Sequence, residues 1–181
     1  LTVRGNDLLY NNQKVFLSGV NFAWNSYGYD FGNNNYWSNS KAVYERWISE
    51  RRIIESVVAK LTDFAEESLD LRLVFSLPSS AEVADAGGNS IRFWLHVQGN
   101  VSPNFGGDGY VTGTDQQNTL IPELRDLLDF AASKNVFVII CLWNGAYIDN
   151  QNAVNIVINE GVLNSYLENA LRPMVSGVGE Y

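Results

Sequence analysis

Histidine and cysteine are almost absent from this chain of 181 residues, which holds one of each, His96 and Cys141. A single cysteine cannot form an internal disulfide, and one histidine with one cysteine cannot supply the four ligands of a structural zinc site. A Ser-His-Asp hydrolase would have to use His96, and the sequence has no Gly-x-Ser-x-Gly turn. We therefore expect no metal site, and we expect Cys141, inside an apolar run, to be a buried structural thiol.

Positive charge is scarce as well, with 12 Lys and Arg against 20 Asp and Glu and a net charge of -8. Without a basic patch or basic helix, we expect no nucleic-acid partner and no binding to anionic membranes. No apolar run reaches membrane-spanning length, and we expect no signal peptide in this chain. The Gly-rich run at 106–109 lacks the spacing of a phosphate-binding loop, so we also expect no cofactor.

Apolar and aromatic residues are abundant, at 46% and 13%, which is typical of a folded globular protein rather than a disordered chain. A length of 181 residues allows one domain with a substantial core. We therefore expect a single domain over residues 1–181.

The stretch at 87–97 is the best candidate for a central strand, because two glycines lead into a run of aromatic and branched residues. Strand side chains alternate in direction, which divides these residues between two faces. The polar and ring-bearing set is Ser90, Arg92, Trp94 and His96, and the apolar set is Ile91, Phe93, Leu95 and Val97. Since an arginine is almost never buried without a partner, we expect an acidic or sugar-like group beside Arg92.

Strand, loop and helix follow one another three times along the chain. Apolar runs predict strands at 15–22, 87–97 and 136–143. Helical spacing predicts a helix capped by Ser40, a helix with Pro122 in its first turn, and a last helix at about 161–175. Parallel strands with right-handed helical crossovers make an α/β fold, in which the loops after the strands share one end of the sheet. That end is where α/β proteins place their ligand sites.

Residues 51–85 differ in composition from the rest of the chain, since they contain no Trp, Tyr, Asn or Gly. We interpret them as an inserted helix-strand-helix segment. Because the segment joins a helix to the following strand, we expect it at the end of the sheet away from the ligand-side loops.

Aromatic rings and amides gather at the predicted strand ends. Sugar rings have apolar faces that stack on Trp and Tyr, and hydroxyls that pair with Asn, Arg and His. The candidate saccharide contacts are Trp24, Tyr27, Arg92, Trp94, His96, Trp143 and Asn144. Each has a structural alternative: core packing for a tryptophan, a salt bridge for Arg92, and a satisfied, partly buried ring for His96. Their convergence at one sheet end favours carbohydrate binding.

Three segments resemble a known family: Val-Phe-Leu-Ser-Gly-Val-Asn-Phe-Ala-Trp at 15–24, Gly-Gly-Asn-Ser-Ile-Arg-Phe-Trp at 87–94, and Val-Ile-Ile-Cys-Leu-Trp-Asn at 138–144. Through them the chain resembles glycoside hydrolase family five, and in particular the animal endo-β-1,4-mannanases, over Leu1 to about Ser176 outside the insertion. The resemblance implies the N-terminal portion of a secreted (β/α)8 TIM barrel, which cleaves internal linkages of β-mannan with retention. It also implies roles for individual residues: Arg92 supports the nucleophile, and Trp143, Asn144, His96 and Trp24 contact sugar.

Retaining hydrolysis needs two carboxylates about 5 Å apart. The resemblance implies glutamates on the fourth and seventh strands, the first within Asn-Glu-Pro, whereas only about three βα units are present here. Asn159-Glu160 is followed by Gly161, so we expect Glu160 to be a helix N-terminal acid. We expect three other helical acids to be solvated: Glu45, Glu123 and Glu168. Our hypothesis is that both catalytic glutamates are missing and that this chain is inactive alone.

Other functions stay open. The chain could be a non-catalytic polysaccharide-binding remnant, or a partner that completes a barrel with another chain. It could also be a cellulase-type relative of the mannanases.

Overall fold

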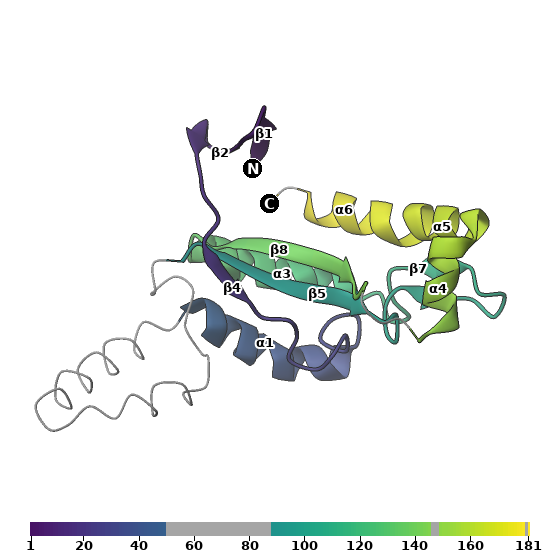
Figure 1. The fold of residues 1–181 in the computed structure, drawn as a ribbon. Helices are drawn as coiled ribbons and strands as arrows, with labels where there is room; N and C mark the ends of the chain where they lie inside the picture. The colour runs from purple at the N-terminus through teal and green to yellow at the C-terminus, as the bar shows by residue number, and fades with distance from the viewer. Residues whose placement is uncertain (50–87, 146–148, 180) are drawn as a thin grey trace, which may run out of the picture.

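Three parallel strands form the central sheet of the computed structural model, which describes residues 1–49, 88–145, 149–179 and 181. They are ordered β4 (Gly19–Asn21), β5 (Ser90–Val97) and β8 (Phe137–Trp143), as Figure 1 shows. The three predicted strands and their parallel direction are confirmed, although the first covers only part of 15–22. The interpreted insertion at 51–85 lies outside the described residues.

One face of this sheet is buried by α1 (Asn34–Ser49) and α3 (Leu120–Ser133), which also contact each other (Figure 1). The predicted apolar face of β5 is confirmed, because none of its four side chains is more than 1% exposed. The two helices contribute further residues to this core: Tyr44, Ile48, Leu120, Leu124, Leu127 and Ala131. Burying such residues is the main favourable term that holds the helices on the sheet.

The opposite face of the sheet carries the polar set of β5 and is only partly covered. Arg92 and Trp94 are half-buried there, whereas Ser90 and His96 are buried. Cys141 pairs with Trp94 in the β5–β8 register and is half-buried. The expectation that this thiol is fully buried was wrong, because Cys141 alternates onto the less covered face of β8.

Helix α1 begins six residues before the cap predicted at Ser40. The backbone N–H groups of Tyr36 and Trp37 donate to the Asn33 carbonyl, so the first turn forms within a run of asparagines. Ser40 is buried inside the helix, where its hydroxyl donates to Asp30 at 2.5 Å. The prediction failed because an asparagine run is typical of a loop, and because a tertiary partner binds the serine hydroxyl.

Glu123 of α3 is buried, so the expectation of a solvated carboxylate was wrong. Its Oε2 accepts a hydrogen bond from the Gly32 N–H at 2.6 Å, which ties the loop after β4 to α3. Burial raises the pKa of this carboxyl group. The expectation is confirmed for Glu168, which is exposed and paired with Arg172 at 2.9 Å.

Four consecutive helical elements form the C-terminal part of the described chain: α4 (Gln151–Ile158), α5 (Glu160–Tyr166), the π-helical turn η1 (Leu167–Leu171) and α6 (Arg172–Val178). The last three confirm the helix predicted at about 161–175, whereas α4 was not predicted. The α6 segment packs against α3.

Two small antiparallel sheets complete the fold: β1 (Thr2–Arg4), β2 (Asp7–Tyr10) and β3 (Gln13–Lys14) in one, and β6 (Asn104–Phe105) with β7 (Val111–Gly113) in the other. The second lies within the connection from β5 to α3, on the side where the strands end. Within the described ranges, no helix has the length and apolar character needed to cross a membrane.

Candidate functional site

Four of the predicted site residues lie together beside the end of β4, on the loop that follows it and on the adjoining part of β5. We call this group, Trp24, Tyr27, Arg92 and Trp94, the rim cluster. The Trp94 N–H donates to the Ala23 carbonyl at 2.9 Å, which holds the loop after β4 beside β5. The ring of Trp24 meets Tyr27 at 4.9 Å and Trp94 at 6.2 Å between centroids, edge to face in both cases. All four side chains are half-buried, so this group is packed and still reaches solvent.

The guanidinium of Arg92 lies over an aromatic ring within the rim cluster. Its guanidinium carbon is 4.1 Å from the centre of Trp94, and its Nη1 donates to the Asn21 Oδ1 at 3.2 Å. The contacts of Arg92 are therefore the Asn21 amide and the Trp94 ring, whereas the sequence predicted an acidic or sugar-like group beside it. Because a guanidinium carries five N–H groups in a fixed plane, Arg92 has further donors for a ligand.

Asp30 anchors the loop that carries Trp24 and Tyr27. Its carboxylate is 1% exposed. It accepts four hydrogen bonds: from the Asn25 N–H at 2.8 Å, the Ser26 N–H at 2.9 Å, the Ser40 hydroxyl at 2.5 Å and the Tyr44 hydroxyl at 3.2 Å. These bonds fix the backbone on both sides of the loop and hold Tyr27 at a φ of 46°, which is uncommon for a residue other than glycine. Sequence reasoning missed Asp30, because an aspartate among Asn and Gly is typical of an ordinary turn.

His96, Trp143 and Tyr166 form a second group, which we call the histidine cluster. The ring of His96 is 4.8 Å from Trp143 and 5.8 Å from Tyr166 between centroids. Its Nδ1 is hydrogen-bonded to the Ser102 hydroxyl at 2.8 Å and its Nε2 to the Tyr166 hydroxyl at 3.3 Å. Burial lowers the pKa of His96 to about 3, so the ring is neutral at pH 7. This geometry matches the structural alternative for His96, since a hydrogen bond to sugar would have to replace one of these two bonds.

Trp143 and Asn144 stand at the end of β8, beside an irregular end of β5. The register of the two strands shifts between Trp94 and Val97, and the Asn144 N–H donates to the Val97 carbonyl at 2.9 Å. Val97 has a φ of 54°, a genuine outlier for a β-branched residue. Gly28, at a φ of 78°, packs so closely that a Cβ there would lie 3.0 Å from the Val97 Cβ. Bulges of this kind are frequent beside functional sites.

The structure thus divides the seven predicted residues between two neighbouring groups, with Asn144 joined to the end of β5. Both groups lie at the strand ends on the less covered side of the sheet, since Arg92, Trp94 and His96 alternate along β5. Three partners were missed by sequence reasoning: Asn21, Ser102 and Tyr166. Across the described parts of the chain, no three His, Cys, Asp or Glu side chains come together as metal ligands would.

Two curated proteins are similar to nearly the whole chain, and both are named mannan endo-1,4-beta-mannosidase. The protein from Cryptopygus antarcticus is 43% identical over 178 residues, which make up 98% of this chain and 38% of that protein. The protein from Mytilus edulis is 33% identical over 180 residues, or 98% of this chain and 40% of that protein. The chain is therefore similar along nearly its whole length to part of these two mannan endo-1,4-β-mannosidases. No general protein-family model matches it.

Solved structures of mannanases share this fold. The β-1,4-D-mannanase of Cryptopygus antarcticus has a TM-score of 0.73 at 43% identity, over 97% of this chain and 39% of that one. The β-mannanase of the blue mussel has a TM-score of 0.72 at 33% identity, over 98% of this chain and 41% of that one. The chain therefore spans about two fifths of the length of its mannanase relatives, and its parallel sheet with covering helices is a partial form of their fold.

Glu160, which resembles the mannanase acid only in following an asparagine, is the first residue of α5 and is exposed. The Asn159 side chain caps this helix by accepting from the N–H groups of Gly161 and Val162 at 2.9 and 3.2 Å. The prediction that Glu160 is a helix N-terminal acid is confirmed.

Proposed function

We propose that this chain is the sugar-binding part of a β-mannanase, and that the 181-residue chain alone binds β-mannan without hydrolysing it. The single observation that carries the proposal is the rim cluster in a chain 43% identical to a mannan endo-1,4-β-mannosidase. Mannan is neutral and rich in hydroxyls, which suits half-buried rings around one arginine better than it suits a charged ligand.

Each member of the rim cluster has a distinct role in this proposal. Trp24, Tyr27 and Trp94 offer apolar faces to pyranose rings, and Arg92 offers planar donors to hydroxyl oxygens. In a complete site Arg92 also supports the nucleophilic carboxylate, because a guanidinium next to a carboxylate stabilises its ionised form. Asn21 and Trp94 hold the guanidinium in place for that task.

The proposed role of the histidine cluster is to hold Trp143 in place for sugar binding. Hydrogen bonds with the Ser102 and Tyr166 hydroxyls fix the buried His96 ring, and Trp143 packs against that ring. In the proposal Trp143 and Asn144 contact sugar directly, whereas His96 mainly orients Trp143.

We propose that the two catalytic carboxylates lie outside this sequence. Retaining hydrolysis requires an acid/base and a nucleophile about 5 Å apart. In the described structure Glu160 is the exposed first residue of α5, and Asp30 is buried with both oxygens hydrogen-bonded, so neither is placed for this role. We propose that further strands close a (β/α)8 barrel around the less covered face of β4, β5 and β8 and bring both glutamates. These strands would come from a longer, secreted form of the protein or from a partner chain.

Two assays on the full 181-residue chain test the proposal. The first is a titration with β-1,4-mannohexaose followed by tryptophan fluorescence, since Trp24 and Trp94 lie in the proposed site. The second measures the release of reducing ends from β-mannan. We expect saturable binding and no release. Arg92→Lys should weaken binding about tenfold, because lysine replaces the fork of guanidinium donors over Trp94 by a single ammonium group.

The matched control is Arg172→Lys, whose arginine forms an exposed pair with Glu168 away from the rim cluster. It should bind mannohexaose as the unaltered chain does. Equal affinity of the Arg92 and control variants would refute the binding site. Release of reducing ends would refute the proposed lack of catalysis, and tighter binding of cellohexaose would favour a cellulase-type relative.

A further inference from the structure

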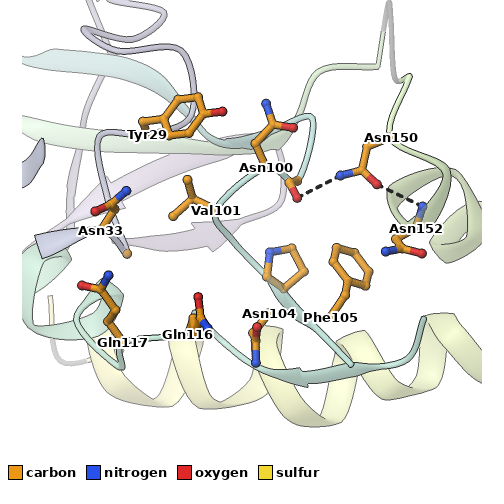
Figure 2. Close-up of a pocket in the computed structure, with 13 residues that line it drawn as sticks. Tyr29, Asn33, Asn100, Val101, Asn104, Phe105, Gln116, Gln117, Asn150 and Asn152 are labelled. Carbon is orange, nitrogen blue, oxygen red and sulfur yellow. Dashed lines mark hydrogen bonds between the residues drawn. The ribbon is translucent and has the colours of Figure 1, made fainter. Parts of the chain in front are cut away.

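A cavity of about 420 Å³ lies outside both ring groups, where three loops meet at the strand ends. Figure 2 shows Tyr29 entering from the loop after β4, Asn100 from the loop after β5, and Asn150 at the start of α4. Its volume falls within the range of roughly 300–1,000 Å³ that is usual for small-molecule sites. None of the residues that line it belongs to the rim cluster or the histidine cluster.

The lining is rich in amides and carries no charge. Seven of its thirteen residues are Asn or Gln, and none is Asp, Glu, Lys, Arg or His. In a chain with a net charge of -8, a wall without a single ionised group is a distinctive feature. A phosphate or a carboxylate would find no counter-ion among the lining residues, so neutral ligands suit this cavity best.

The amides fall into two kinds. Asn150 is committed to the fold, since its Nδ2 donates to the Gly99 carbonyl at 3.1 Å and its Oδ1 accepts from the Asn152 N–H at 3.0 Å (Figure 2). Asn33, Asn100 and Gln116 have no side-chain hydrogen-bond partner among the residues that the structure describes. They come from three separate loops and face one cavity. Each retains a carbonyl acceptor and an NH₂ donor for a ligand.

We propose that this cavity binds a short neutral saccharide at a site separate from the rim cluster. A pyranose pairs its hydroxyls, as donors and acceptors at once, with amides that offer both. Its apolar face packs on the half-buried rings of Tyr29 and Phe105, around which Figure 2 shows the amides. A purely apolar ligand would leave Asn33, Asn100 and Gln116 without partners. The assignment rests on these amides and holds whether or not the rim cluster binds mannan.

The test uses β-1,4-mannobiose and the ¹⁵N-labelled 181-residue chain, with the side-chain NH₂ signals of Asn100 and Gln116 followed by NMR. Asn100→Ala and Gln116→Ala assign these signals by removing them. We expect both signals to move on titration and to saturate together. Each alanine variant should weaken this binding about fivefold, the value of one hydrogen bond. Both side chains are exposed and make no intramolecular hydrogen bond in the described structure, so neither variant should affect folding.

Two controls separate this cavity from the rim cluster. Asn164→Ala removes an exposed amide on α5, outside the lining, and should change nothing. Trp94→Ala should abolish mannohexaose binding at the rim cluster while the Asn100 and Gln116 signals still respond to mannobiose. If the signals do not move in the unaltered chain, or if Trp94→Ala abolishes their response, the cavity does not bind the saccharide. Either result would leave the proposed binding at the rim cluster unaffected. An equal response to glucuronate would overturn the preference for a neutral ligand.

Discussion

Asp30→Asn is the substitution whose effect follows most directly from the structure. The buried carboxylate accepts two hydrogen bonds at each oxygen, one from a backbone N–H and one from a hydroxyl. Asparagine has the same shape but replaces one oxygen by an NH₂ group. The hydroxyls of Ser40 and Tyr44 can rotate and accept from this group. A backbone N–H cannot, so the amide leaves either Asn25 or Ser26 facing another donor.

The cost can be worked out bond by bond. A buried donor without a partner costs about 1–3 kcal/mol, and the remaining bonds lose the strength that the charged acceptor gave them. Removing a buried charge offsets part of this loss. We therefore expect Asp30→Asn to lower the free energy of unfolding by about 2–3 kcal/mol, a large share of the roughly 5–15 kcal/mol typical of a domain.

Urea unfolding followed by tryptophan fluorescence measures this loss. With a slope of about 2 kcal/mol per molar urea, the unfolding midpoint should fall by roughly 1–1.5 M. Asp129→Asn is the control, because Asp129 is exposed and, among the described residues, accepts a hydrogen bond from the exposed Tyr181 hydroxyl alone. Its unfolding midpoint should stay within about 0.3 M of that of the unaltered chain. If the two variants unfold at the same urea concentration, Asp30 does not anchor the loop of Trp24 and Tyr27.

Two further perturbations test the strand ends and the histidine cluster. Gly19→Ala should prevent native pairing of β4 with β5, because the added Cβ would overlap the Ser90 carbonyl oxygen. Gly107→Ala is the control: its Cβ would meet open space, so the circular-dichroism spectrum and the urea midpoint should stay unchanged. Burial lowers the pKa of His96 to about 3 from an ordinary 6.5, so the unfolded chain binds the extra proton and stability falls with pH below about 6.5. Between pH 7 and pH 5, the free energy of unfolding measured in urea should fall by about 2 kcal/mol more in the unaltered chain than in His96→Gln. An equal fall in both chains would mean that the ring is charged in the folded chain at pH 5.

The parallel sheet was predictable because its signals are local. Ile91, Phe93, Leu95 and Val97 alternate with polar and aromatic residues, and this alternation alone assigns the two faces of β5. The helix around Pro122 likewise shows a clear helical period in its leucines. Such patterns depend on neighbours a few residues away, which a sequence displays directly.

The supports of the site were not predictable, because they join residues distant in the chain. Tyr166 reaches His96 across 70 positions, and Glu123 reaches the Gly32 N–H across 91. Nothing near Glu123 distinguishes it from a solvated helical acid, and only the packing of α3 against the loop after β4 buries it. The start of α1 was missed for the same reason, since propensity gave way to the tertiary bond between Ser40 and Asp30.

Side chains on one face of β5 lie in two different environments, although they follow the same two-residue alternation along the strand. Arg92, Trp94 and His96 all project to the same face of β5, yet the first two stay half-buried while His96 is 2% exposed. The difference comes from the neighbours, because Trp143 and Tyr166 cover only the far end of the strand. Since Arg92 and Trp94 keep their solvent contact, a ligand at this rim would meet a cation and rings before it met the neutral imidazole. The order of side chains along β5 therefore determines which groups remain open to a ligand and which are held by their neighbours.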